Sequence, residues 1–218
     1  MLELLQFRHS PYNEKVRWAL DQSALIIDWL EAKHPEVALL PQDAALREEA
    51  LQIQSRFDED LTPRMRRTVL DALLRQPGYF ARVFADGGSA MRRLAYACTV
   101  PLAAPLVRKG NGIAGPETLA DGHRAATEAF DFVARSSAAT GYLCGGSFTL
   151  ADLTAAASLA MLVRPPESPM HCPQPVGRDF AALVARYAQH PGAHWVRHIY
   201  ANHRGSRSDF DGLSTAAR

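Results

Sequence analysis

The stretch Gly145–Val163, GGSFTLADLTAAASLAMLV, carries the clearest structural signal in the chain. Thr149 is followed three residues later by Asp152, which is the spacing of a capping box at the first turn of a helix. The residues that follow are mostly small or apolar, so neighbouring helices could approach this one closely. Arg164 and Pro165 then end the pattern. The stretch predicts a helix over 151–163 in the middle of a helical bundle.

Helical periodicity fills most of the chain on both sides of this stretch, from residue 44 onward. Apolar residues recur at intervals of three and four over 44–74, and Pro63 is expected to kink or divide this segment. The sequence predicts an all-α domain over 44–204, followed by a polar and flexible tail over 205–218. Its further helices are expected over 79–84, 90–98, 117–139, 179–189 and 192–202, with a loop over 109–115.

The first 35 residues have a different pattern. Residues 2–7 read as a short apolar strand, a turn over 9–11 follows, and a helical pattern then runs over 12–33. Ser10 stands where strand meets helix, next to unpaired N–H groups and the positive end of a helix dipole, which favour an anion. Taken alone, such a serine is more often a simple turn or N-cap residue. A lone strand also leaves its backbone groups without ladder partners.

Two segments resemble the glutathione S-transferases. The N-terminal FRHSPYNEKVRWAL, residues 7–20, resembles the start of their thioredoxin-like domain, and GGSFTLADLTAAASLAMLV resembles the signature of their helical C-terminal domain. QSALIIDWLE, residues 22–31, resembles the family segment that opens the third helix, yet it follows the first helix with no gap. The strand, helix and two strands that the family places between them are absent, roughly 40 residues or more.

The resemblance implies a fold that is mainly α, and α+β overall. A truncated or incomplete thioredoxin-like domain over 1–35 would precede an all-α bundle of the glutathione S-transferase C-terminal type. The implied co-substrate is glutathione, and the implied partner of the helical domain is a small-molecule electrophile or hydrophobic ligand. Members of the family usually form homodimers, so a homodimer is the implied assembly.

The resemblance also implies site residues. Ser10 would donate a hydrogen bond to the glutathione sulfur and stabilise the thiolate, which is the nucleophilic form. Gln22 and Ser23 match the pair that binds the γ-glutamyl end of glutathione, and Tyr12 could place a hydroxyl near the same site or simply pack against the helix. Asn13 replaces the second cysteine of a redox turn, which excludes a dithiol mechanism.

A second interpretation follows from the missing middle. Because the 12–33 pattern is continuous, Gln22 and Ser23 would fall in mid-helix, where the backbone N–H groups are already used. The chain would then be a non-catalytic binding or interaction protein whose glutathione site has been lost by internal deletion.

Composition excludes several other classes. A net charge of +1 gives no argument for nucleic acid or an anionic membrane surface, and no window of 18 uninterrupted apolar residues is present, so no membrane partner is expected. Three widely separated cysteines suit a reducing compartment, which favours the cytoplasm.

His190, His194 and His198 are spaced by four, but no acidic or cysteine ligand supports them, so no metal is expected. The arginines could cover solvated helix faces, contact acidic residues 58–60 or line the mouth of a second-substrate site: Arg64, Arg66, Arg67, Arg92 and Arg93.

Overall fold

The computed structural model describes residues 39–84, 90–170 and 172–205, leaving aside the side chains of residues 92 and 93. This part of the chain is mainly α-helical and contains no strand, so the mainly-α prediction is confirmed at that level. The predicted strand over 2–7, the helix over 12–33 and the tail from 206 onward lie outside the described residues. The thioredoxin-like remnant and the domain boundaries therefore stay predictions.

The helices follow one another with short connections. Their bounds are α3 Ala44–Ser55, η2 Arg56–Leu61, α4 Thr62–Leu74, α5 Pro77–Phe84, α6 Ala90–Gly110, α7 Pro116–Ser136, α8 Leu150–Val163, α9 Arg178–Tyr187 and α10 Pro191–His203. The described helices agree with the predicted ones to within a few residues, with one exception.

The exception is α6, which the sequence predicted to end at residue 98. The helix continues to Gly110 through two prolines. Pro101 and Pro105 are four residues apart, and both are exposed. Because each proline removes only one intrahelical hydrogen bond and its ring faces solvent, the helix passes through them. The expected loop over 109–115 is correspondingly reduced to residues 111–115.

The segment 44–74 is helical throughout, as predicted, but its irregularity is not at Pro63. Six residues, Arg56–Leu61, form a π-helical turn, and the N–H of Thr62 donates to the carbonyl of Phe57, five residues earlier. Pro63 follows as the second residue of α4. The helix is therefore widened just before the proline rather than divided by it.

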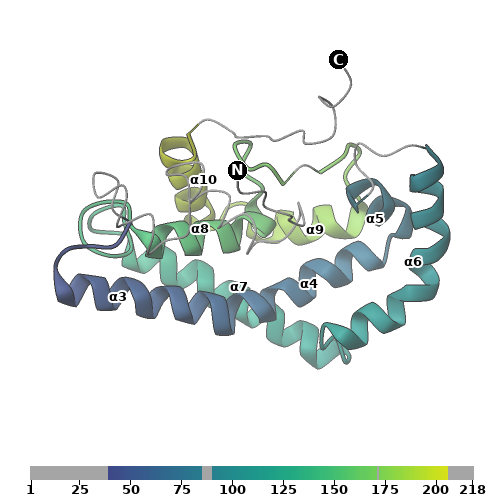
Figure 1. The fold of residues 1–218 in the computed structure, drawn as a ribbon, viewed down its shortest axis with the longest axis horizontal. Coiled ribbons are helices and arrows are strands. Elements are labelled where there is room, and N and C mark those ends of the chain that lie inside the picture. The colour runs from purple at the N-terminus through teal and green to yellow at the C-terminus, as the bar shows by residue number, and fades with distance from the viewer. Residues whose placement is uncertain (1–38, 85–89, 171, 206–218) are drawn as a thin grey trace, which may run out of the picture.

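Helix α8 is the centre of the bundle, as its composition predicted (Figure 1). All fourteen of its residues are buried. Helices α3, α7, α9 and α10 all pack against it, and α4 runs beside α7. Alanines make the close approach possible, and the hydroxyl of Thr62 on α4 donates to that of Ser158 at 2.9 Å inside the core. A helix that is apolar on all sides can be stable only when it is surrounded in this way.

Helices α5 and α6 stand apart from this centre (Figure 1). Helix α6 packs chiefly on α5 and touches the end of α4. No helix in the described ranges combines the length and the apolar character needed to cross a bilayer.

Candidate functional site

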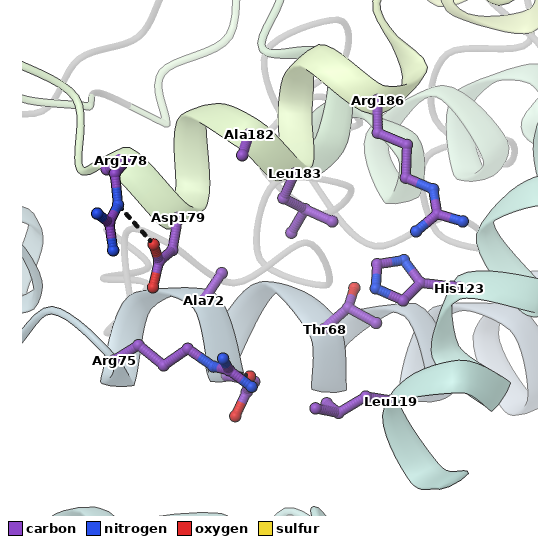
Figure 2. Close-up of a pocket in the computed structure, with 11 residues that line it drawn as sticks. Thr68, Ala72, Arg75, Leu119, His123, Arg178, Asp179, Ala182, Leu183 and Arg186 are labelled. Carbon is purple, nitrogen blue, oxygen red and sulfur yellow. Dashed lines mark hydrogen bonds and ion pairs between the residues drawn. The ribbon is translucent and has the colours of Figure 1, made fainter. Parts of the chain in front are cut away.

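The four residues that the sequence predicted to bind glutathione, Ser10, Tyr12, Gln22 and Ser23, lie outside the described residues. The helical part of the chain nevertheless contains a hollow of its own, with a volume of about 440 Å³. It opens between the C-terminal half of α4, the first turns of α7 and the whole of α9 (Figure 2). Its lining consists of Thr68, Asp71, Ala72, Arg75, Leu119, His123, Arg178, Asp179, Ala182, Leu183 and Arg186.

Helical spacing explains which side chains reach the hollow. Asp71 and Arg75 are one turn apart at the end of α4, and Leu119 and His123 are one turn apart near the start of α7. On α9, Leu183 is buried against the bundle. The hollow thus has an apolar floor and a charged rim, which is the usual composition of a small-molecule site.

One carboxylate at this rim is already occupied. The side chain of Asp71 is buried, and it pairs with Arg75 at 2.7 Å and with Arg108 from α6. Two guanidinium groups share one carboxylate, so this end of the hollow keeps an excess positive charge. A smaller adjoining hollow of about 350 Å³ shares Arg75 and Leu119 with the first one and is bounded by residues 113–116.

The opposite end of the hollow holds a histidine and an arginine. The Nδ1 atom of His123 lies 3.0 Å from the hydroxyl of Tyr187. Burial, and then the positive charge of Arg186, lower the pKa of His123 below its ordinary value. Figure 2 shows the Arg186 and His123 side chains converging from α9 and α7. His123 is therefore neutral at neutral pH, and its Nε2 atom is available to a ligand.

Arg186 has no acidic partner among the described residues. Its guanidinium lies over the ring of the adjacent Tyr187, 5.8 Å from the ring centroid. Arg178, by contrast, pairs with Asp179 at 3.3 Å. An unpaired guanidinium beside a neutral histidine and an apolar floor suits a ligand that combines a carboxylate or phosphate with an apolar body.

The described residues that line the hollow offer binding groups but no activated nucleophile. The only hydroxyl among them belongs to Thr68, which is buried and donates to the carbonyl of Met65 at 2.7 Å. Sequence reasoning missed this hollow, because its charged residues come from three segments separated by about fifty residues each. Their only sequence signal is the one-turn spacing within each segment.

The arginines singled out in the sequence have other roles. Arg64 donates two hydrogen bonds to the carboxylate of Asp121, at 2.7 and 2.9 Å, and its Nη1 also donates to both oxygens of Asp60, at 3.1 and 3.3 Å. Arg67 lies 3.9 Å from the same Asp121 carboxylate. These contacts join α4 to α7, so Arg64 stabilises the bundle and does not line the hollow. The prediction that these arginines contact the acidic residues 58–60 is thus confirmed for the pair Arg64 and Asp60.

The three histidines spaced by four each have a separate partner. His190 caps α10, because its Nδ1 accepts the N–H of Gly192, while its Nε2 lies 3.2 Å from Asp131. His194 contacts Arg197, and His198 contacts Asn202. Within the described ranges, no three histidine, cysteine or acidic side chains come together as metal ligands.

The predicted capping box is present at the start of α8. One oxygen of the Asp152 carboxylate accepts from the backbone N–H and the hydroxyl of Thr149, at 2.9 and 3.0 Å. The other accepts the N–H of Leu143 at 2.8 Å. Asp152 is fully buried, and this burial raises its pKa to about 6 despite the hydrogen bonds that lower it.

No protein-family model matches the chain, and no curated protein or solved structure is significantly similar to it. Any function therefore has to be argued from its residues and their geometry.

Proposed function

We propose that the chain is a glutathione S-transferase-like protein that joins the glutathione thiolate to an electrophile, with Ser10 stabilising the thiolate. The observation that carries the proposal is the start of α8. There the signature that resembles the family's C-terminal domain forms a buried capping box, in which Thr149 and Asp152 begin the central helix of an all-helical bundle. The N-terminal resemblance around Ser10 supplies the catalytic half of the proposal, with Tyr12, Gln22 and Ser23 as further contacts to glutathione.

The hollow between α4, α7 and α9 supports a refinement of the electrophile. Its floor includes Leu119 and Leu183, and its rim carries Arg186 without an acidic partner among the described residues. We therefore propose an electrophile with an apolar ring and a negatively charged group, rather than a purely hydrophobic one. The three cysteines are free thiols, which supports a reducing compartment such as the cytoplasm.

The first experiment measures conjugation of glutathione to chloronitrobenzene by the purified full chain. A hydroxyl that stabilises the thiolate lowers the barrier by a few kcal/mol, so Ser10→Ala should reduce kcat/KM roughly 100-fold. Ser55→Ala is the control, because it removes the same hydroxyl from an exposed position on α3 that has no part in the proposed site. No turnover by the unaltered chain, or equal turnover by Ser10→Ala, would contradict the proposal.

The substrate class is tested with two electrophiles of the same reactivity class. Arg186→Gln should raise KM for a chloronitrobenzene that carries a carboxylate about tenfold or more, because an ion pair in a partly buried site is lost. It should leave KM for the uncharged chloronitrobenzene unchanged. Arg178→Gln is the matched control, since Arg178 is already paired with Asp179. Equal effects on both electrophiles would refute the proposed negative charge on the electrophile and would leave the transferase proposal standing.

The second candidate is a non-catalytic binding protein. The observation that favours it is that helix α4 with its C-cap Arg75, helix α7 and helix α9 supply all of the described residues that line the hollow. The intact mass separates the two candidates. A mass of 23.9 kDa favours the binding protein, whereas a mass greater by roughly 4–5 kDa restores the missing segment and favours the transferase. Micromolar glutathione binding to a 23.9 kDa chain would contradict the binding-protein candidate.

A further inference from the structure

Helix α6 exposes four large apolar side chains between residues 91 and 106. Met91 is 76% exposed, Leu94 61%, Leu102 84% and Leu106 74%. The one other large apolar side chain that is exposed in the described ranges is Leu51 on α3, at 42%. Four of the five such residues therefore gather on one helix, which is the distribution expected of an interaction surface and not of scattered surface residues.

These four side chains and the exposed Cys98 form a single stripe, which we call the α6 face: Met91, Leu94, Cys98, Leu102 and Leu106. At about 100° per residue, these positions span an arc of about 120°. Val100, on the opposite side of the helix, is buried. Helix α6 stands at the edge of the molecule, so its outer face is open to a partner (Figure 1).

The sequence of the α6 face is close to a palindrome. Counting from Cys98, Leu94 and Leu102 are four residues away on either side, Met91 is seven residues before and Leu106 eight residues after. In both directions the helix therefore presents a leucine four residues from Cys98, whereas Met91 has Pro105 as its counterpart. Two copies placed antiparallel about a twofold axis at Cys98 would therefore set Leu94 of each copy against Leu102 of the other.

We propose that the α6 face binds the α6 face of a second copy of this chain, antiparallel, with the twofold axis at Cys98. The small side chain at the crossing point permits the close helix approach that such packing requires. In this register Met91 meets the second copy between Pro105 and Leu106. The inference does not depend on the proposed transferase activity.

The charges of α6 are compatible with this pairing. The helix contains four basic residues and no acidic one, so a pairing that opposed them would repel. With the axis at Cys98, positions 92 and 93 come opposite Ala104 and Ala103 of the second copy. Lys109 lies beyond the paired stripe. The antiparallel register therefore avoids the like-charge contacts that a parallel pairing would create.

The area of the α6 face sets the expected strength. The exposed apolar surface of its four large side chains is on the order of 300–400 Å² per copy, before the alanines and prolines between them are added. Stable dimers bury about 800 Å² per partner. The face alone thus predicts a reversible, concentration-dependent dimer, with a Kd in roughly the micromolar range.

Sedimentation of the full chain over a range of concentrations tests the pairing. Leu102→Glu should weaken dimerisation at least tenfold, because it places a charge at the apolar contact with Leu94 of the second copy. Leu51→Glu makes the same change on an isolated exposed leucine of α3 and should leave the dimer intact. The proposal would be overturned if the chain stayed monomeric at all concentrations, or if both substitutions weakened dimerisation equally. Circular dichroism melts check that both variants are folded.

Mixing two variants tests the register. Leu94→Lys and Leu102→Glu should each be mainly monomeric alone. Mixed in equal amounts they should form a heterodimer, because the lysine and the glutamate then face each other while Leu102 of one copy still meets Leu94 of the other. A parallel pairing would juxtapose identical positions and would show no such recovery. Failure of the mixture to associate would therefore overturn the antiparallel arrangement.

Cysteine crosslinking provides a readout that needs no change to the face. Cys98 is exposed, whereas Cys144 is buried. Mild oxidation with diamide should yield a covalent dimer that dithiothreitol reverses, and Cys98→Ser should abolish it. If Cys98 resists modification in the native chain, another segment covers the α6 face and the proposal is wrong. Binding of the monomer to lipid vesicles through α6, lost in Leu102→Glu, would assign the face to a membrane and would overturn it equally.

Discussion

The carboxylate of Asp152 accepts the backbone N–H of Leu143 at 2.8 Å, from a residue nine positions earlier in the chain. The same carboxylate caps α8 through Thr149. One fully buried side chain thus fixes both the first turn of the central helix and the loop that leads into it. Burial raises the pKa of this carboxyl to about 6, so its charge has a cost in the folded state.

This pKa predicts how stability depends on pH. Because the folded pKa of Asp152 lies above its value of about 3.9 in an unfolded chain, the folded state binds the proton more tightly. The contribution of Asp152 to stability is therefore fully present below the unfolded pKa of about 3.9 and is lost as the pH rises from there through the folded pKa of about 6. Between pH 4.5 and pH 7.5 the loss should be about 2 kcal/mol.

Denaturant unfolding of the unaltered chain and of Asp152→Asn at the two pH values measures this loss. The difference in unfolding free energy between the two proteins should be larger at pH 4.5 than at pH 7.5. At both values the variant should be less stable, because the amide cannot accept all three hydrogen bonds. An unchanged difference across the range would show that burial does not raise this pKa.

Asp121 is expected to show the opposite pH dependence. The hydrogen bond to Arg64 is the largest of the interactions that lower the pKa of its carboxyl. The stability that this pair provides is therefore present above the unfolded pKa of about 3.9 and is lost as the pH falls through the lower folded value. Asp121→Asn should cost about 1 kcal/mol of unfolding free energy at pH 7. It should cost nothing at a pH low enough to protonate the Asp121 carboxyl in both the folded and the unfolded state. A cost that persists in strong acid would mean that packing, and not charge, is responsible.

Gly122 on α7 is expected to resist replacement. A Cβ atom there would lie 2.7 Å from the backbone oxygen of Arg64 and 2.6 Å from Thr68 on α4. Gly122→Ala should therefore destabilise the bundle by about 2 kcal/mol, although alanine is normally the better helix former by up to about 1 kcal/mol. Gly78→Ala on α5 is the control, because a Cβ there meets no atom within 4 Å. Thermal melts should place the two variants on opposite sides of the unaltered chain, and equal melting temperatures would refute the close approach.

His123 reports on the charge of the hollow. Burial is the first cause of its lowered pKa and Arg186 is the second. Arg186→Gln should therefore raise the pKa of His123 only part of the way to its ordinary value, as measured by NMR titration. Arg178→Gln should leave it unchanged, because Asp179 already pairs with that arginine. An equal shift in both variants would show that the two arginines act only through the net charge of the protein.

The sequence was most informative where the signal is local. The capping box of Thr149 and Asp152 and the small residues of α8 depend on neighbours three or four positions away, so the central helix was predicted nearly to the residue. The sequence predicts α6 too short, because Pro101 and Pro105 would be expected to end a helix. Their effect depends on which side faces solvent, and a single sequence does not specify that.

The candidate site was not predictable in the same way. Asp71, His123 and Arg186 lie on three helices, and only the packing of α4, α7 and α9 brings them to one hollow. The sequence instead directed attention to Ser10 and its neighbours, which lie outside the described residues. Arg64 was noticed for its charge, yet its partner Asp121 is 57 positions away and no periodic pattern relates the two.

The π-helical turn predicts how the helix around it responds to the deletion of one residue. Ile53, Phe57, Leu61 and Met65 are all buried, although they are spaced by four throughout. In a regular α-helix three such steps would rotate the last side chain by about 120° away from the first. The wide turn absorbs that rotation, so it behaves as one extra residue stored within the helix. Deleting the exposed Glu59 should therefore convert the wide turn into a regular α-helical one and leave the residues after it on the same face, so that Arg64 still reaches Asp121.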